Sequence, residues 1–598
     1  MSKTQGFNNN LSKETYLYIL YKYVTKTPLL QNKTPQELNS LFQNNIFPSS
    51  FPDCFIESEL PQPQSLHELA LLWEKSLDSL DTGKNKKDGA FFTPKPIVEY
   101  IVRDSLSSTN DNPYIIDPAC GSGIFLLEVA NTLSKKCKTT PQRREIIENS
   151  IFGIDINQDS VEICRTLLLY FFILETGDLT SLPNLKNNII QGNSLLSPQD
   201  SRTIKNTINW KEAFPCIKKH NGFDCIIGNP PYGLKRDNQL SNEENEALLE
   251  KYSTTRSGKI NKYLAFMANS YDHLAPKGVL SFIVPNSWLG IDGGEKIRKQ
   301  FLTDGALEKL IIFQKPVFKN IGVETIIFRA VKKGNLKNIN IYNAKDKDNI
   351  PSKPSYNISN KICLEKMNSR IPTIWDDETE KLFLHLNEHS QKLSDLSFIP
   401  YIALQAYATG HGTPPQTSAD VKNHVFHSKT KSSDEYIPYL EGKDIQRYNL
   451  NWSGNFLRHG IFLSDPQPLI RYTQPRIILR EILNPLPYIL MATYTDAPYL
   501  YNKSALHIIH KEQDKEALLA LLAILNSKTA STILLIKGRK SQRQLFPKIV
   551  ARDLQEFPLP NNFLEIKSNL ANLALKMLAK VDTSIETKIN KIVAEAYH

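Results

Sequence analysis

The sequence predicts an α/β protein built on a doubly wound, mostly parallel sheet. Short apolar segments of strand length recur between residues 114 and 328, and segments with helical periodicity separate them. The strand segments are apolar almost throughout, as expected for strands that are covered on both faces. Helical patterns precede this part of the chain, and a mixture of short β patterns and helices follows it. We therefore expect a helical N-terminal domain, a sheet domain and a mixed α+β C-terminal domain.

Four segments are expected from pattern and composition. The first alternates helical stretches, such as Glu14 to Tyr23, with Pro-containing connectors. The third is polar and rich in Asn, Lys and Ser, which predicts a connector, and the fourth mixes short strands with two apolar helical patterns. The expected boundaries give a helical domain at 1–85, the sheet domain at 86–335, a polar connector at 336–395 and the C-terminal domain at 396–598.

The strands of the sheet are expected at seven apolar segments. Helical patterns, such as Gly123 to Ser134 and Ser160 to Leu174, lie between them. The seven segments are Tyr114 to Asp117, Ile151 to Asp155, Asn188 to Gln191, Phe223 to Ile227, Val279 to Val284, Leu310 to Phe313 and Thr325 to Phe328.

Length and composition exclude several classes of protein. The chain has 598 residues, of which 40% are hydrophobic and 22% charged, as is typical of globular proteins with several domains. The longest apolar run, Ala517 to Leu525, is too short to span a bilayer, and the N-terminal residues lack the apolar core of a signal peptide. The seven cysteines include no C-x-x-C pair. We therefore expect a cytoplasmic protein without a membrane partner, a disulfide framework or a metal site.

The charge of the chain is uneven. The formal net charge is +10, and residues 391–598 hold 25 Lys and Arg against 18 Asp and Glu. A basic region joined to a less charged one suggests a polyanionic partner, although many basic proteins bind no nucleic acid.

The glycine-rich string from Asp117 to Gly123 (DPACGSG) follows the first predicted strand and opens a helix. Glycines allow a tight turn and a close approach of the backbone to a ligand, and the carboxylate at the strand end can bind a cation or a hydroxyl group. Taken alone, such a turn holds various nucleotides or simply packs. The next strand ends in Asp155, whose carboxylate can accept from both hydroxyl groups of a ribose.

The string Asn229-Pro-Pro-Tyr232 follows another buried strand. It brings an amide, two rigid prolines and an aromatic ring to the carboxyl edge of the sheet, where ligands bind in such folds. A proline-terminated strand with an Asn cap is the structural alternative, and we reject it because the two other site motifs precede the string in the chain. The Phe-Pro-Cys string that ends at Cys216, ahead of this strand, resembles a motif around a catalytic thiol. It lies in a polar stretch, so we do not expect Cys216 to be catalytic.

These motifs resemble those of S-adenosylmethionine-dependent amino-DNA methyltransferases. Phe92-Thr-Pro94 lies upstream of the glycine motif and the basic region lies downstream of all motifs, an order that is similar to the gamma class of adenine methyltransferases in Type II and Type IIG restriction–modification enzymes. The resemblance covers roughly Gly89 to Lys333. It implies a seven-stranded, Rossmann-like methyltransferase sheet and S-adenosyl-L-methionine as cofactor.

The same resemblance implies a role for each cofactor-binding position. Thr93 would contact the methionine carboxylate, Asp155 would hold the ribose and Ile156 would lie against the adenine ring. The family often has Asp where this chain has Asn193, so its amide oxygen would have to accept from the cofactor's amino group. The implied cofactor-binding residues are Thr93, Asp117, Pro118, Ala119, Gly121, Gly123, Asp155, Ile156 and Asn193.

The methyl-accepting group needs help from its site, because an exocyclic adenine nitrogen is a poor nucleophile. The Asn229 side-chain oxygen and the Pro230 carbonyl can accept from its hydrogens and stabilise developing positive charge. Tyr232, after Pro231, would stack on the base once it has left the duplex. By resemblance, Phe318 would cover the opposite face, although its type fits a core position equally well. Asn229, Pro230, Pro231 and Tyr232 are therefore the expected catalytic residues.

A basic run near the C-terminus is the expected DNA contact. It holds six cations and no acidic residue between Lys537 and Arg552, and Gln542 or Gln544 could read base edges. A solvated basic face is the alternative. The expected DNA-binding residues are Lys537, Arg539, Lys540, Arg543 and Lys548.

Together these expectations predict a site-specific DNA methyltransferase that acts on the exocyclic amino group of adenine in a flipped-out base of double-stranded DNA, in a restriction–modification or related system. A separate restriction endonuclease or specificity subunit is left open as a further partner. The alternatives are a cytosine amino methyltransferase, a bifunctional Type IIG enzyme and a catalytically idle DNA-recognition module. The N-terminal segment shows no acidic-x-Lys metal site, so we expect no magnesium-dependent cutting.

Overall fold

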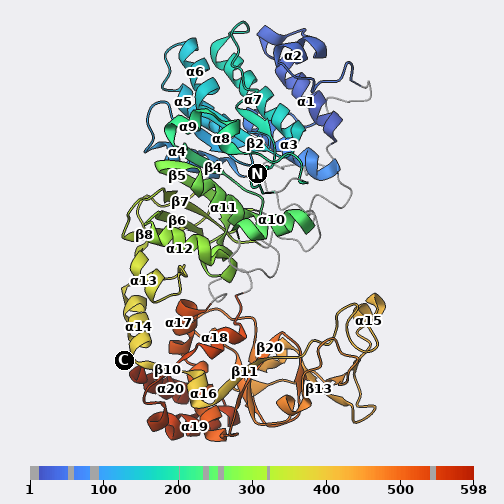
Figure 1. Cartoon of the computed structure of the whole chain (residues 1–598). Coiled ribbons are helices and arrows are strands. Elements are labelled where there is room, and N and C mark those ends of the chain that lie inside the picture. The colour runs from blue at the N-terminus through green and yellow to red at the C-terminus, as the bar shows by residue number, and fades with distance from the viewer. Residues whose placement is uncertain are drawn as a thin grey trace, which may run out of the picture. The chain divides into compact units, whose positions relative to one another are not determined.

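A computed structural model describes most of the chain and divides it into two compact units. The first unit is Met1–Ile371 and the second is Pro372–His598. Elements α1 to α13 belong to the first unit, and α14 to α20 belong to the second (Figure 1). The described residues are 12–51, 60–80, 93–200, 203–233, 242–252, 261–318, 323–538 and 547–597.

The first unit is built on one large sheet. Among the described residues this sheet has nine strands in the order β3-β2-β1-β4-β5-β7-β6-β8-β9. Pairs that involve β7, and the pair of β8 with β9, are antiparallel, while the other pairs are parallel. The strands are β1 (Ile115–Asp117), β2 (Ile151–Asp155), β3 (Ile189–Gln191), β4 (Phe223–Gly228), β5 (Leu274–Pro285), β6 (Leu307–Phe313), β7 (Thr325–Val331), β8 (Asn338–Ala344) and β9 (Tyr356–Ser359).

The prediction of a mostly parallel sheet is confirmed, but the predicted number of strands is wrong. All seven expected segments form strands, β1 to β7. The two additional strands, β8 and β9, lie in the segment that was expected to be a polar connector. Strand β8 buries Ile339, Ile341 and Ala344 and turns asparagines outward. Such alternation of apolar residues with Asn is typical of a strand near the edge of a sheet. It differs from the continuous apolar run of a central strand.

Helices cover this sheet and carry the site loops at their ends. Helices α5 and α7 contact β2, while α4 and α11 contact β5. Nearly all of α7 is buried between Ser160 and Ile173. The helices of the first unit are α1 (Lys13–Thr25), α2 (Pro35–Leu41), α3 (Leu66–Leu80), α4 (Lys95–Leu106), α5 (Ile124–Ser134), α6 (Thr140–Ser150), α7 (Gln158–Thr176), α8 (Trp210–Ala213), α9 (Cys216–His220), α10 (Asn242–Tyr252), α11 (Lys262–Asp272), α12 (Glu295–Thr303) and α13 (Asn360–Glu365).

The N-terminal helices pack directly on the sheet-covering helices. The Trp73 indole of α3 donates to Ser160 Oγ at the start of α7, with a distance of 3.2 Å. Lys13 Nζ of α1 lies 2.6 Å from the Asp159 carboxylate on the same helix. Contacts also join α3 to α5. The N-terminal helices are therefore part of the first unit and do not form a separate body.

The second unit combines small sheets with a helical layer. Two four-stranded sheets have the orders β11-β20-β17-β18 and β12-β16-β13-β19. One core lies between helices α16 and α19 and the strands β17 and β20, and a second core surrounds Leu440, Leu457 and Tyr472. The strands are β10 (Ser390–Lys392), β11 (Phe398–Ile402), β12 (His427–Ser428), β13 (Tyr436–Leu440), β14 (Ile445–Gln446), β15 (Asn449–Leu450), β16 (Asn455–Arg458), β17 (Arg476–Arg480), β18 (Ala492–Thr495), β19 (Leu500–Tyr501), β20 (Ala505–His510) and β21 (Pro558–Pro560).

The helices of this unit include the longest apolar run of the sequence. Ala517 to Leu525 lies in α16 and is buried throughout. Within the ranges that the structure describes, no helix by itself combines the length and apolar character needed to cross a membrane. The helices are α14 (Asp377–Glu388), α15 (Ser418–Asn423), α16 (Lys515–Leu525), α17 (Lys528–Lys537), α18 (Ala551–Gln555), α19 (Phe563–Ala579) and α20 (Thr583–Ala596).

The segment 336–395 is divided between the two units and is not an irregular connector. Strands β8 and β9 and helix α13 extend the first unit. Helix α14 and strand β10 belong to the second unit, where Leu386 and Leu393 join the hydrophobic core. The boundary between the units falls after Ile371, inside the expected connector.

Candidate functional site

The glycine-rich loop closes tightly between β1 and α5. Asp117 is 2% exposed, and its Oδ1 accepts from the Ala119 amide over 3.0 Å. The Cys120 amide donates to the Ile154 carbonyl of β2 over 2.9 Å. Gly123 has φ +86°, and a Cβ at this position would stand 2.4 Å from Cys164 Sγ of α7. Only glycine therefore allows the loop to turn into α5 at this distance from α7.

Asp155 joins the end of β2 to the same loop. Its Oδ2 accepts from the Gly121 amide and its Oδ1 from the Asn157 amide, each over 2.9 Å. Ile156, the next residue, is an aliphatic side chain that is 62% exposed. The Pro118 carbonyl accepts from Ser194 Oγ, in the loop that follows β3. The ends of three neighbouring strands thus meet at the carboxyl edge of the sheet, as the sequence predicts for a ligand site.

Burial shifts the ionisation of the carboxyl groups at this edge toward the protonated form. Desolvation raises the pKa of the Asp117 carboxyl to about 8; the bond from Ala119 opposes this rise, and the charges of Asp155 and Glu74 add to it. The pKa of Asp155 is also raised by burial, against the bonds from its neighbouring amides. A carboxylate that is held out of water favours a ligand that brings positive charge or hydroxyl donors.

The string after β4 lies beside the glycine-rich loop because β4 pairs with β1. Gly228 has φ +150°, and a Cβ there would stand 2.6 Å from Asp117 Oδ1. The next residue, Asn229, donates from Nδ2 to Thr93 Oγ1 over 3.1 Å. Thr93 is 2% exposed and stands two residues before α4. The fold therefore brings the Asn229 motif to two motifs that lie more than 100 residues before it in the chain.

The aromatic residues of the site are enclosed. Tyr232 is 0% exposed and its hydroxyl donates to the Ile283 carbonyl of β5 over 3.4 Å. Its ring centroid lies 6.4 Å from Phe318 and 6.4 Å from Tyr263, in edge-on arrangements. Tyr232 and Phe318 are therefore neighbours, as a shared base pocket requires. A base can stack between them only after the two rings separate. Pro230 is buried and Pro231 is half-buried between Asn229 and Tyr232.

Asn193 contacts a carboxylate that the sequence did not single out. Its Oδ1 accepts from the Leu195 amide over 3.0 Å, and its Nδ2 donates to Glu244 Oε1 of α10 over 3.2 Å. Burial raises the pKa of Glu244. An acidic group therefore lies beside Asn193, and it comes from a helix residue 51 positions further along the chain. The composition of α10 is acidic and polar, as is typical of a solvated helix, and does not single out Glu244. The only sequence signal for this contact is that Asn193 stands where an Asp is expected.

Cys216 lies at the opposite edge of the sheet. Phe214 packs on Phe223, the first residue of β4, with ring centroids 5.7 Å apart. Asn229 follows the other end of β4, about 20 Å away at the rise of a strand. Partial burial also raises the pKa of the Cys216 thiol, which disfavours the nucleophilic thiolate.

The expected DNA-binding residues are only partly described. Lys548 Nζ lies 2.8 Å from the Glu481 carboxylate, and Lys537 Nζ donates to Asn387 Oδ1 over 3.1 Å. Arg552 pairs with Glu556. These cations are engaged within the second unit, so the basic run is less open than its composition suggests. Arg539, Lys540, Arg543, Gln542 and Gln544 lie outside the described residues.

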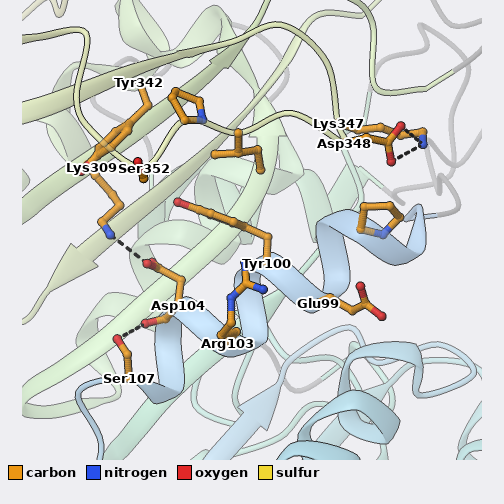
Figure 2. Close-up of a pocket in the computed structure, with 13 residues that line it drawn as sticks. Glu99, Tyr100, Arg103, Asp104, Ser107, Lys309, Tyr342, Lys347, Asp348 and Ser352 are labelled. Carbon is orange, nitrogen blue, oxygen red and sulfur yellow. Dashed lines mark hydrogen bonds and ion pairs between the residues drawn. The ribbon is translucent and has the colours of Figure 1, made fainter.

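A separate cavity of about 510 Å³ lies in the first unit and contains none of the predicted site residues. Figure 2 shows Tyr100 of α4 in this cavity, close to the ion pair between Lys309 and Asp104. Positive and negative side chains balance around it, so its charge selects no class of ligand. The charged lining residues are Glu99, Arg103, Asp104, Lys309, Lys347 and Asp348.

Comparison with known proteins agrees with this geometry. Residues 149–318 match the Eco57I restriction-modification methylase family, and residues 437–559 match the TaqI-like C-terminal specificity domain. The first match includes Asp155, Asn193, Asn229 to Tyr232 and Phe318. Two segments of the chain thus resemble a methylase and a specificity domain of restriction–modification type, which confirms the predicted resemblance.

Individual proteins that are similar to this chain come from Type II restriction–modification systems. The Type II restriction enzyme and methyltransferase RM.Eco57I of Escherichia coli is 30% identical over 291 residues, which are 42% of this chain and 29% of that protein. The Type II methyltransferase M.HincII of Haemophilus influenzae is 24% identical over 346 residues, which are 53% of this chain and 56% of that protein. The alignments thus cover less than two thirds of either relative.

Solved structures share the fold. The Type IIL restriction-modification enzyme MmeI, in complex with DNA, aligns with a TM-score of 0.60 and 13% identity over 99% of this chain and 88% of that chain. The DrdV–DNA complex aligns with a TM-score of 0.58 and 13% identity over 95% of this chain and 66% of that chain. At this identity the likeness concerns the fold.

Proposed function

We propose that the protein is a site-specific DNA methyltransferase that uses S-adenosyl-L-methionine to methylate the exocyclic amino group of adenine. The observation that carries this proposal is the hydrogen bond between Asn229 Nδ2 and Thr93 Oγ1, which joins the expected target-base motif to the expected cofactor motif. The matched methylase segment supports the same reaction class.

The residues around the glycine-rich loop fit this cofactor. A sulfonium and an ammonium group are compatible with buried carboxylates such as that of Asp117, which is 2% exposed. Asp155 offers a carboxylate for ribose hydroxyls, and the exposed Ile156 offers an apolar surface for a purine. When bound, the cofactor supplies an electrophilic methyl group. Asp117, Gly121 and Gly123 would hold its amino-acid end, and Asn193 with Glu244 would lie near its purine.

The Asn-Pro-Pro-Tyr string would hold the methyl-accepting base. Asn229 and the Pro230 carbonyl would accept from the amino hydrogens, so that positive charge on the nitrogen is stabilised as the new bond forms. The rings of Tyr232 and Phe318 would separate and enclose the base, which has to leave the duplex first. The second unit, which includes the specificity segment, would read the target sequence in double-stranded DNA.

The first test is methyl transfer by the purified full-length chain. Incubation with isotopically labelled cofactor and unmethylated genomic DNA should place label in N6-methyladenine, identified by mass analysis of nucleosides. Label in N4-methylcytosine would instead support the cytosine alternative. Discrete DNA fragments in the presence of magnesium would support a bifunctional restriction enzyme. The absence of transfer to any base would reject the proposal.

Asn229→Ala should lower the transfer rate roughly 100-fold, because an acceptor for the developing charge is lost. Affinity for duplex DNA, measured by fluorescence anisotropy, should change less than twofold. Asn338→Ala, on the exposed side of β8, is a matched control that should leave both quantities unchanged. An Asn229→Ala protein that transfers methyl groups at the original rate would contradict the role of this residue.

A further inference from the structure

One acidic residue from the N-terminal helices reaches the glycine-rich loop. Glu74 lies in α3 directly after Trp73, whose buried indole bonds Ser160 of α7 and whose ring packs against Tyr16 at 5.1 Å. These contacts fix the rotation and the depth of α3 against the sheet-covering helices. The side chain of Glu74 is thereby held against the loop and is half-buried.

The Glu74 carboxylate contacts the loop at two successive residues. Ser122 Oγ donates to Glu74 Oε1 over 2.8 Å, and Ser122 is fully buried. The same oxygen lies 3.3 Å from the point where a Cβ on Gly121 would stand. Gly121 therefore lets a carboxylate from another helix approach the loop backbone. The amide of Gly121 meanwhile donates to Asp155, so that two carboxylates border this one residue.

The position of Glu74 also has an electrostatic consequence. Burial raises the pKa of Asp117, at the other end of the loop, and the negative charges of Asp155 and Glu74 raise it further. Three carboxylates from α3, β1 and β2 thus surround a short loop whose backbone is expected to border the amino-acid end of the cofactor. A cationic ammonium group is the ligand chemistry that compensates this charge.

We propose that Glu74 is a positioning residue for the amino-acid end of the cofactor: it holds the glycine-rich loop through Ser122 and places negative charge beside Gly121. This inference rests on the proposed methyltransferase function and extends it. The N-terminal helical segment is then a part of the cofactor site, and α3 contributes one wall of it.

The test compares two ligands that differ only at the amino-acid end. S-adenosyl-L-homocysteine carries the ammonium and carboxylate groups, whereas 5′-methylthioadenosine lacks them. Isothermal titration of the full-length chain should show that Glu74→Gln and Glu74→Ala weaken S-adenosyl-L-homocysteine at least tenfold and change 5′-methylthioadenosine less than twofold. Glu68→Gln, on an exposed position of the same helix, should change neither ligand.

Two results would overturn the inference. Unchanged affinity for S-adenosyl-L-homocysteine in both Glu74 variants would remove any role for the carboxylate, and an equal loss for both ligands would indicate a purely structural role. A wild-type chain that binds neither ligand would instead reject the proposed function itself.

The contribution of the Ser122 contact can be separated by a double-mutant cycle. Ser122→Ala alone should weaken the binding of S-adenosyl-L-homocysteine. In the Glu74→Ala background it should change the affinity less than twofold further, because both substitutions remove the same hydrogen bond. Full additivity would contradict action through Ser122. Thermal unfolding of each variant identifies any variant that fails to fold. If Glu74→Ala does not fold, the ligand comparison is made with Glu74→Gln, whose amide oxygen still accepts from Ser122.

Discussion

Asp117 shows how one buried carboxyl can make ligand binding depend on pH. Its pKa of about 8 means that, near neutral pH, most molecules carry a proton on this group. Asp155 and Glu74 face the same loop and add negative charge. Because the raised pKa belongs to the unliganded protein, the proton has to leave before the carboxylate can accept from a cationic ligand, and this becomes easier as pH rises toward 8.

Affinity for S-adenosyl-L-methionine should therefore increase about tenfold between pH 6 and pH 7, below the range in which the free amino group of the ligand loses its proton. Isothermal titration at the two pH values measures this change, and buffers of different ionisation enthalpy should report proton release. Asp117→Asn should bind weakly with little pH dependence. A wild-type affinity that is the same at both pH values would count against the assignment.

Residue positions were predictable where motif and strand end coincide. Asp117, Asp155 and Asn229 could be placed together because parallel strands deliver their carboxyl ends to one edge, whereas Thr93 was expected there only from the family resemblance. Glu74 and Glu244 could not, because their contacts depend on how α3 and α10 pack, and helix packing leaves no fixed spacing in the sequence. The count of basic residues also overstates the positive charge at the surface, because Arg476 is 0% exposed and donates to the Ala497 carbonyl within the second unit.

At the scale of elements, α4 is held to the sheet by a partly buried ion-pair network. Asp104 of α4 lies 2.8 Å from Lys309 Nζ of β6 and 3.5 Å from Arg329 Nε of β7. Arg329 also pairs with Glu308. The three side chains of Asp104, Lys309 and Arg329 are 18%, 16% and 6% exposed, so the charges are largely removed from water. This network sets the position of the helix that follows Thr93.

Asp104→Asn should destabilise the first unit by about 3 kcal/mol, because two poorly hydrated cations lose their shared anion. Differential scanning calorimetry should show a fall in unfolding temperature of about 5 °C. Glu99→Gln is a matched control on the same helix, since its pair with Lys95 at 3.7 Å is exposed and should contribute less than about 1 kcal/mol. Equal effects of the two substitutions would show that the Asp104 network adds nothing special.

Element prediction succeeded for β1 to β7 and failed for β8 and β9, at one edge of the sheet. Strands β1, β2, β4 and β7 contain the apolar runs that burial on both faces demands. Strands β8 and β9 alternate with Asn and Ser because one face is less covered, so their composition resembles that of a loop. A polar edge strand becomes recognisable only through its partner, and β6 pairs with β8 across about 30 residues.

At the scale of the whole molecule, the chain consists of two units with different tasks in the proposed reaction. The boundary after Ile371 falls inside the polar segment that composition marks, although that segment folds into both units. The methylase and specificity segments fall in separate units, which agrees with a division between chemistry and target reading. The nearly complete alignment with the MmeI complex supports the fold of both units.

DNA affinity of the full chain should depend strongly on salt if several cations of the second unit contact phosphates. Lys548→Ala should weaken binding to all sequences alike and reduce the slope of log affinity against log salt by about one. The lysine would exchange Glu481 for a phosphate on binding. Lys591→Ala, an exposed cation of α20, is the control. A slope that is identical in the wild type and the Lys548 variant would remove this residue from the interface.

The near contact between Gly228 and Asp117 means that the two substrates of the proposed reaction cannot be treated as independent. The peptide that carries Asn229 begins against the carboxyl group that the donor would engage. If bound donor changes the affinity for the target base, bound base must change the affinity for the donor by the same factor, because coupling free energies are reciprocal. Affinity for a target duplex measured without donor, and affinity for donor measured without duplex, would then each differ by the same factor from the corresponding affinity in the ternary complex.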